Sequence, residues 1–323
     1  MRFNPNGTIS RCGHMVNPAQ FESLDAMESS EWLANIKKQF VQDQWPAECI
    51  RCEKTESITG TSIRLNSITA DEQETQRDYL QVGGVLDNVC NSACQTCSAQ
   101  CSTKIGKLIS NIYPKINNID KFRDLPQERI VHLDINGGEP SASKNYKSLL
   151  KNLPPNLKTL RVNTNCAIML PVLKEINSRG IKVTVTVSFD GVEAVHDYIR
   201  WPIKWEKFYK NLLEYKSYQL HDLNLWTTVN THNINDLENI FKFVQEHNFN
   251  HSYALLEKPA QLNVAYSNQL TRQAKEKFKS SLSPELIRLA EFIAVKTDNQ
   301  TEFDMFVAQQ DQLRGISISN FIK

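Results

Sequence analysis

The sequence predicts an α/β fold built around a parallel sheet. From about residue 80 onward, short runs rich in β-branched residues alternate with longer stretches of helical periodicity, which is typical of successive βα units. The stretch 236–247 shows the helical period clearly, because Leu237, Ile240, Phe241 and Val244 recur at steps of three and four residues. No run approaches the roughly 18 apolar residues of a membrane span, so we expect no membrane partner.

Six strands and five intervening helices are expected in this order along the chain. The strands are predicted at residues 79–86, 130–135, 158–162, 182–187, 223–229 and 252–256. The helices are predicted at residues 102–113, 143–150, 170–178, 206–218 and 236–247. Gly180 stands where a capping glycine would end the third helix.

The two ends of the chain have a different character from this central region. Apolar residues at helical spacing from Trp32 to Phe40 predict one amphipathic helix, with Ser29 and Ser30 as candidate caps. A polar run at 69–77 has the composition of a connector, and the end of the chain is helical and charged. We therefore expect three parts: a Cys-containing appendage at 1–78, a core domain at 79–265 and a helical extension at 266–323.

Bulk composition limits the classes of function. The chain has 323 residues and a formal net charge of +1, without a basic cluster interleaved with aromatic residues, so a nucleic-acid partner is not expected. The first residues lack the apolar core of a secretory signal, and the chain contains eight cysteines. Thiols in a reducing compartment serve metals or redox chemistry more often than disulfides, so we expect a cytoplasmic protein.

Three cysteines directly after the first predicted core strand are the strongest chemical signal. Cys90, Cys94 and Cys97 have the spacing C-x3-C-x2-C. Three thiolates on one tight loop can hold three irons of a [4Fe–4S] cluster and leave the fourth iron open for catalysis. The alternatives are a structural zinc site, which prefers two C-x2-C pairs or Cys/His pairs, and ordinary buried thiols.

Further short motifs follow the cysteines in a fixed order. Three of them end apolar runs and one comes shortly after: Gly137-Gly138-Glu139-Pro140, Asn163-Thr164-Asn165, Ser188-Phe189-Asp190-Gly191 and His196-Asp197-Tyr198-Ile199-Arg200. Over about residues 80 to 265 the chain thus resembles the radical S-adenosylmethionine (radical SAM) enzymes, whose C-x3-C-x2-C loop follows the first barrel strand. The resemblance implies a partial (β/α)6 TIM-like barrel that is open on one side.

The resemblance also implies a reaction and its partners. In this family the open iron chelates S-adenosylmethionine, and one electron from the reduced cluster cleaves it to a 5′-deoxyadenosyl radical that abstracts hydrogen from the substrate. The expected partners are a peptide, protein or small-molecule substrate and an electron donor such as a flavodoxin or ferredoxin. The protein then supplies positioning and exclusion of water.

The Gly-Gly-Glu-Pro motif resembles the family segment that meets the methionine amino group. Gly137 and Gly138 would let the backbone approach closely, and Glu139 would accept from an ammonium or form a structural salt bridge. The alternative is an ordinary Gly-Gly turn with a solvated glutamate.

The remaining pocket residues stand at strand ends. The resemblance implies that Ser188 and Asp190 form hydrogen bonds with the ribose hydroxyls and that Arg200 binds the methionine carboxylate. Asn163 and Asn230 are expected to face the same mouth. Each of these side chains could instead cap a helix or a turn.

The other cysteines permit a second site. Cys12, Cys49 and Cys52 could hold an auxiliary [4Fe–4S] cluster or zinc, or no metal. Radical SAM enzymes of the twitch/SPASM type carry an auxiliary cluster, commonly in a C-terminal appendage, whereas these cysteines are N-terminal. Cys166 ends a predicted strand near the mouth, where its thiol could donate hydrogen to a substrate radical, ligate metal or remain inert.

Two classes of function therefore remain. The first is a radical SAM oxidoreductase or transferase. The second is a non-catalytic iron–sulfur or zinc-binding interaction protein. A pure zinc module has no need for the Gly-Gly-Glu-Pro and Ser-Phe-Asp-Gly motifs, so these segments favour the first class.

Overall fold

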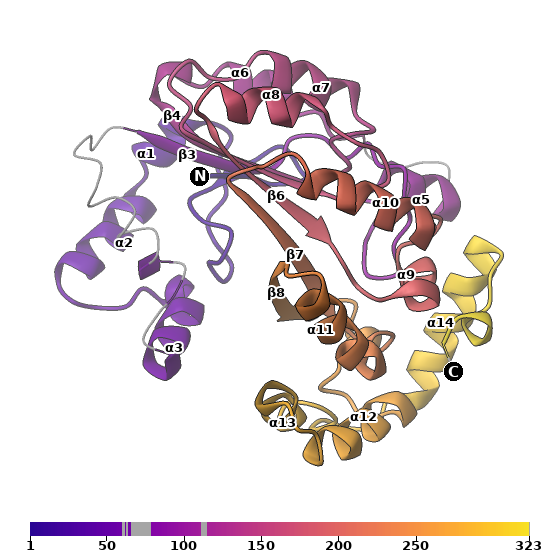
Figure 1. The fold of residues 1–323 in the computed structure, drawn as a ribbon. Helices are drawn as coiled ribbons and strands as arrows, with labels where there is room; N and C mark the ends of the chain where they lie inside the picture. Colours follow the sequence, from indigo (N-terminus) through magenta and orange to yellow (C-terminus); the bar gives the residue numbers. More distant parts are fainter. Residues whose placement is uncertain (60–61, 63, 66–78, 111–114, 323) are drawn as a thin grey trace.

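A curved, mostly parallel sheet forms the centre of the protein (Figure 1). The structure is a computed structural model, which describes residues 1–59, 62, 64–65, 79–110 and 115–322. The eight strands lie in the order β2-β1-β3-β4-β5-β6-β7-β8. Their bounds are β1 Arg2–Phe3, β2 Ile9–Ser10, β3 Leu80–Val85, β4 Ile130–Asn136, β5 Thr159–Thr164, β6 Lys182–Ser188, β7 Asp222–Val229 and β8 Asn250–Leu255.

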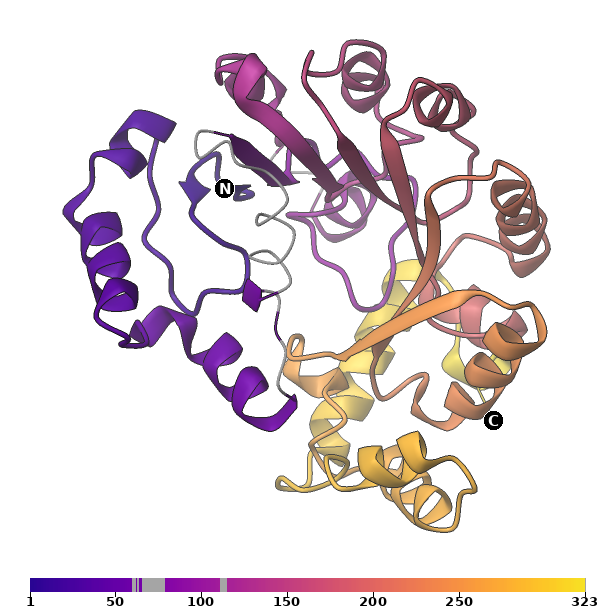
Figure 2. The same cartoon turned by 60° about the vertical axis from the view of Figure 1, so that its left-hand side comes forward.

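The six predicted strands are confirmed as β3 to β8, with all neighbours parallel and in sequence order. Figure 2 shows the helices on the outer side of the curved sheet, which matches a partial TIM-like barrel. The α/β fold class is therefore as predicted. The six βα units place the carboxyl ends of their strands at one mouth, where barrel enzymes build their sites.

Two short strands at the start of the chain were not predicted. β1 pairs with β3 in parallel and with β2 in antiparallel orientation, so the first residues extend the sheet. Gly84 (φ +106°) makes this approach possible, since a Cβ there would lie 2.3 Å from the carbonyl oxygen of Phe3. The ammonium group of Met1 donates to the carbonyl of Gln81 at 2.6 Å. Strands of two residues leave no period in a sequence, which is why the pattern did not reveal them.

The core helices cover the outer face of the sheet. Their bounds are α5 Thr103–Ile109, α6 Ile119–Arg123, α7 Lys144–Lys151, α8 Val172–Ser178, α9 Glu193–Ile199, α10 Trp205–Lys216 and α11 Leu237–Glu246. The short helices α6 and α9 were not predicted, whereas the other five match the expected stretches. The predicted end of the first helix, residues 111–113, and the connector 69–77 lie outside the described residues. Gly180 adopts φ +90° just after α8, as expected for a capping glycine.

Each of the central strands β4 to β7 buries one face and leaves the other partly open. Ile135, Val162 and Val185 form one register row and are fully buried under the helices. The opposite, inner face carries a second register row of polar residues, none of them fully buried: Asp134, Arg161, Thr184 and Asp222. The sheet therefore presents a polar inner surface that solvent reaches.

Both ends of the chain also contain helices. The appendage contains α1 Leu24–Glu28, α2 Glu31–Val41 and α3 Ile50–Thr59. Ser30 caps α2 by accepting from the N–H of Leu33 at 3.2 Å, whereas Ser29 follows α1 as its C-terminal cap. The extension contains α12 Gln269–Lys279, α13 Pro284–Ala290 and α14 Gln300–Arg314. None of the helices in the described part of the chain is long and apolar enough to cross a membrane.

Candidate cysteine-loop site

The three cysteines of the C-x3-C-x2-C motif lie on the loop that follows β3. Cys94 is buried, Cys90 is half-buried and Cys97 is exposed. The hydroxyl of Ser92 lies 3.3 Å from the sulfur of Cys90 and 3.5 Å from that of Cys94. Burial and, after it, the negative charge of Cys94 raise the pKa of the Cys90 thiol. The thiols of this loop are thus close enough to influence one another electrostatically.

The geometry of the thiols bears on which metal group they fit. Within the described ranges, no three His, Cys, Asp or Glu side chains converge closely enough to hold a single metal ion. The ligands of a four-iron cluster bind different irons and do not have to converge on one point. A zinc ion, by contrast, needs four ligands around a single centre.

The backbone of this loop is held by the segment that carries the His-Asp-Tyr-Ile-Arg motif and by the start of α5. The N–H groups of Ala93 and Gln95 donate to the carbonyls of Trp201 and Ile199, at 2.8 and 2.9 Å. The hydroxyl of Ser102 donates to the carbonyl of Ser92 at 2.6 Å. The loop is thus fixed from two directions before any ligand binds.

Asn165, at the end of β5, holds the same loop through its side chain. Its amide nitrogen donates to the Oδ1 of Asn91 at 2.7 Å and contacts the hydroxyl of Ser92 at 3.2 Å. Both acceptors lie between the first two cysteines. The Asn163-Thr164-Asn165 motif therefore contributes a residue that positions the cysteine loop.

The Gly-Gly-Glu-Pro segment packs directly on the cysteine loop. Gly138 has φ +58°, and a Cβ there would lie 2.7 Å from the carbonyl oxygen of Val89. Its N–H donates to the carbonyl of Cys101 at 3.1 Å, and that of Glu139 donates to the carbonyl of Val89 at 2.7 Å. Gly137 also adopts a positive φ, +77°. Only glycine permits so close an approach with this backbone conformation.

The carboxylate of Glu139 is an internal brace. It is buried and accepts from the N–H and hydroxyl of Ser141, the hydroxyl of Thr164 and the N–H of Asn165, at 2.6 to 3.0 Å. Burial raises its pKa, and these hydrogen bonds oppose the rise. The side chain thus ties the end of β4 to the end of β5. This arrangement differs from the expected contact with a methionine ammonium, because the carboxylate already bonds four protein donors.

Asp190 and Arg200 form a buried ion pair beside the cysteine loop. Arg200 Nη1 donates to Asp190 Oδ2 at 3.1 Å, and Asp190 Oδ1 accepts from the N–H of Thr228 at 2.8 Å. Burial alone would lower the pKa of Arg200, but the negative charges of Cys94, Asp190, Cys90 and Cys97 raise it on balance. The guanidinium therefore lies within the electrostatic reach of all three thiols. The carboxylate of Asp190, expected to meet a ribose, is engaged by its partner arginine.

One donor of Arg200 remains free for a ligand. Its Nε is buried and has no hydrogen-bond partner among the residues that the structure describes. A buried donor without a partner is costly, so its presence beside three thiols suits an anionic ligand at this place. Arg200 therefore retains a donor with which it could bind a carboxylate.

The other predicted pocket residues divide into two groups. Asn163 bonds the side chain of Asn136 on the inner face, and Ser188 ends β6 on that face, partly exposed. Asn230 is fully buried, where it donates to the carbonyl of Thr228 and accepts from the N–H of His232, so its side chain closes a local turn instead of facing the mouth.

Cys166 also lies away from its expected place. Its side chain is fully buried in the hydrophobic core, and the sulfur lies 3.9 Å from the carbonyl oxygen of Phe208 on α10. Burial raises the pKa of this thiol well above its ordinary value. The backbone of Cys166 adopts φ +60°, which turns the side chain inward under the helix layer.

One residue of the site was missed at the sequence level. Arg314, at the end of α14, is buried and donates to the carbonyls of Ala93 and Cys94, at 2.8 and 3.3 Å. No local pattern around Arg314 indicates this contact, because its partners lie about 220 residues earlier in the chain.

The second set of cysteines lies in the appendage. Cys12, Cys49 and Cys52 are all half-buried free thiols. Burial, followed by the negative charges of Cys52 and Cys12, raises the pKa of Cys49 to about 11. The three thiols are therefore neighbours, although they do not converge on one point as ligands of a single ion would.

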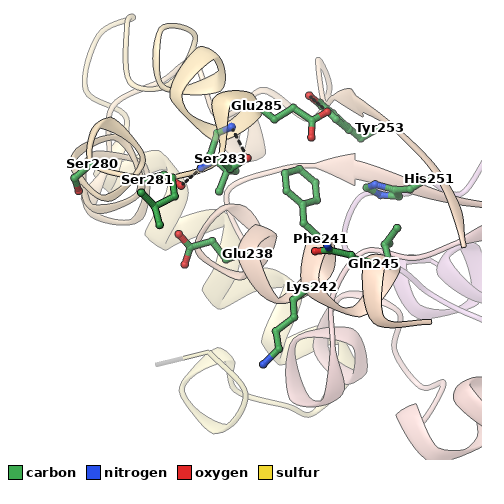
Figure 3. A pocket seen from close by; sticks show the side chains of 13 residues that line it. Glu238, Phe241, Lys242, Gln245, His251, Tyr253, Ser280, Ser281, Ser283 and Glu285 are labelled. Carbon is green, nitrogen blue, oxygen red and sulfur yellow. Dashed lines mark hydrogen bonds between the residues drawn. The ribbon is translucent and has the colours of Figure 1, made fainter. Parts of the chain in front are cut away.

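A cavity of about 740 Å³ lies elsewhere, between α11, β8 and the segment 280–286 (Figure 3). Phe241, His251 and Tyr253 line one side of it, while Lys242 points away. None of the predicted site residues lines this cavity. It is therefore separate from the cysteine loop.

Comparisons with known proteins gave structural similarity only. No protein-family model matches the chain, and no curated protein matches it in sequence. The solved structure of anSMEcpe with bound AdoMet and Kp18Cys peptide has a TM-score of 0.44 at 17% identity, covering 74% of this chain and 63% of that one.

Two structures of Streptococcus suis SuiB are similar as well. SuiB bound to precursor peptide SuiA has a TM-score of 0.45 at 12% identity, covering 86% of this chain and 64% of that one. SuiB bound to S-adenosylmethionine has a TM-score of 0.43 at 11% identity, covering 87% and 59%. The match thus spans less than two thirds of the length of each of these proteins.

Proposed function

We propose that this protein is a radical SAM enzyme whose [4Fe–4S] cluster is held by Cys90, Cys94 and Cys97. The observation that carries the proposal is the juxtaposition of these thiols with the buried guanidinium of Arg200, at the mouth of a parallel sheet. When bound, the cluster and S-adenosylmethionine would supply one-electron cleavage and a primary carbon radical. The protein would contribute orientation, charge and exclusion of water.

The chain's own residues have distinct tasks in this proposal. Arg200, with its free Nε, would bind the carboxylate of S-adenosylmethionine, and the Gly137-Gly138 backbone would allow close approach of its amino end. Asp190 would hold Arg200 in place, and Glu139 would keep the ends of β4 and β5 together. We therefore assign these two carboxylates a positioning task.

The substrate would lie on the inner face of the sheet. Its polar row of Asp134, Arg161, Thr184 and Asp222 favours a substrate rich in hydrogen-bonding groups, such as a peptide, a protein segment or a polar small molecule. A flavodoxin or ferredoxin would deliver the electron. We place the reaction in the cytoplasm, where thiols stay reduced.

The appendage would carry an accessory site. We propose that Cys12, Cys49 and Cys52 bind an auxiliary [4Fe–4S] cluster of the twitch/SPASM kind, with zinc as the alternative. The division into an appendage at 1–78, a core at 79–265 and an extension at 266–323 remains part of this proposal.

A second candidate is a metal-binding interaction protein without turnover. It is favoured by Asn230 and Cys166, whose side chains are buried away from the mouth, which leaves fewer groups to handle a substrate.

One experiment separates the two candidates. Protein purified without oxygen is analysed for visible absorbance, iron, sulfide and, after reduction with dithionite, the formation of 5′-deoxyadenosine from S-adenosylmethionine. The enzyme proposal requires iron, sulfide and 5′-deoxyadenosine together. Bound iron without any 5′-deoxyadenosine favours the interaction protein, and absence of iron rejects the cluster.

A further inference from the structure

The C-terminal α-helix α14 reaches the cysteine loop. Arg314 ends α14 and is 7% exposed; Nε donates to the carbonyl of Ala93 at 2.8 Å and Nη2 to that of Cys94 at 3.3 Å. Nη1 donates to the carbonyl and side chain of Gln310, at 3.1 and 2.6 Å, which fixes the direction of the guanidinium. A planar fork held in this way presents two donors to two successive carbonyls.

The helix itself is held in place by an independent contact. The hydroxyl of Tyr198, on α9, donates to Asp311 Oδ1 at 2.8 Å, and Asp311 Oδ2 accepts from the N–H of Ile318 at 2.7 Å. These contacts connect α14 to the core on the side from which Ile199 and Trp201 hold the cysteine loop. The position of Arg314 is therefore determined by the core and does not depend on the loop alone.

Charge adds a second effect to the hydrogen bonds. The guanidinium of Arg314 is buried and donates to the backbone of Ala93 and Cys94, so its positive charge lies directly against the loop that carries the three thiols. A buried cation stabilises nearby negative charge more strongly than an exposed one, because water screens it less.

We propose that Arg314 is a positioning residue of the cysteine loop: it orients the carbonyls of Ala93 and Cys94 and supplies positive charge to the thiolates or to the cluster they hold. The part of this inference that concerns a cluster rests on the proposed function. The part that concerns the order of the loop does not, since it depends only on contacts within the chain.

The first test measures the order of the loop in the full-length chain, with or without iron. Hydrogen–deuterium exchange of the amides of residues 92–97 is compared for the wild type and the variants Arg314→Gln and Arg288→Gln. Arg288 is an exposed residue of α13, so its variant is the matched control. Loss of hydrogen bonds from a charged donor raises the equilibrium constant for local opening of the loop by about tenfold or more. The amides of the loop should therefore exchange about tenfold faster in Arg314→Gln than in the wild type. Equal exchange in all three proteins would overturn the inference.

The second test measures charge in the iron-loaded protein. Arg314→Gln should lower the midpoint potential of the cluster and release iron to a chelator about tenfold faster than wild type or Arg288→Gln. Arg314→Lys keeps the charge but loses the fork, so it should restore the potential and not the rate of iron release. If Arg314→Lys and Arg314→Gln have the same potential, the charge assignment is wrong. If the wild type binds no iron, the proposed function fails, and the exchange measurement alone decides the positioning role.

Discussion

Arg200 donates to Asp190 at 3.1 Å in an ion pair whose side chains are 11% and 2% exposed. The pair joins the segment after α9 to the end of β6, next to the three cysteines. From the sequence, both residues are expected to bind S-adenosylmethionine, the aspartate at its ribose and the arginine at its carboxylate. Both carboxylate oxygens of Asp190 already accept hydrogen bonds, so its role is to hold Arg200. Arg200 still has its Nε available for a ligand.

Asp190→Asn should therefore destabilise the protein. Removing one partner of a buried ion pair leaves an uncompensated charge, which typically costs about 3–5 kcal/mol. The free energy of unfolding from urea titrations measures this loss. Adding Arg200→Met to the variant should recover part of it, while Glu175→Gln, in the exposed pair with Arg179, should change stability by less than about 1 kcal/mol. Equal effects of Asp190→Asn and Glu175→Gln would show that the buried pair is unimportant.

Replacing Cys90, Cys94 and Cys97 together by Ala should remove one cluster and all cleavage of S-adenosylmethionine. Without thiolates on this loop, no protein ligands remain for the catalytic irons. Iron analysis and detection of 5′-deoxyadenosine measure the outcome, and Cys166→Ala, in the hydrophobic core, is the control for loss of a thiol. A triple variant that still produces 5′-deoxyadenosine would falsify the assignment.

The appendage cysteines lead to a stoichiometric prediction. If Cys12, Cys49 and Cys52 bind an auxiliary cluster, the wild type should contain about eight irons per chain. The triple variant of the loop cysteines should then retain about four. Zinc in place of iron in that variant indicates a structural site, and complete absence of metal rejects the accessory site.

Buried histidines should make stability depend on pH. Burial, followed by the charge of Arg314, lowers the pKa of His232 from 6.5 to about 3. The unfolded chain then binds a proton that the folded chain excludes, so this contribution to stability is present above pH 6.5 and is lost as the pH falls toward 3. For one such histidine the slope is about 1.4 kcal/mol per pH unit inside that window.

The prediction is tested by urea unfolding of wild type and His232→Gln between pH 7 and pH 4. The free energy of unfolding of the variant should fall less steeply with decreasing pH. His221→Gln, at an exposed position, should retain the wild-type slope. Identical slopes for wild type and His232→Gln would show that His232 takes up its proton without cost to the fold.

Local patterns predicted much of the fold. The helical period of 236–247 correctly predicted α11, and the short apolar runs correctly predicted β3 to β8. Both succeeded because the spacing of apolar residues within one segment determines which face of it can be buried. The C-x3-C-x2-C spacing similarly placed three thiols on one loop without reference to the rest of the chain. The two-residue strands β1 and β2 were missed, since they are too short to display a period.

The sequence by itself thus determined the order of βα units and the cysteine loop at the end of the first of them. Only the tertiary structure decided which side chains reach that loop. Arg200 lies beside it, paired with Asp190, and Arg314 comes from α14, whereas Glu139 bonds internally and Cys166 points into the core. The physical reason is that a local period reports burial and spacing along one segment. Hydrogen bonds between groups 10 to 221 residues apart depend on how complete elements pack.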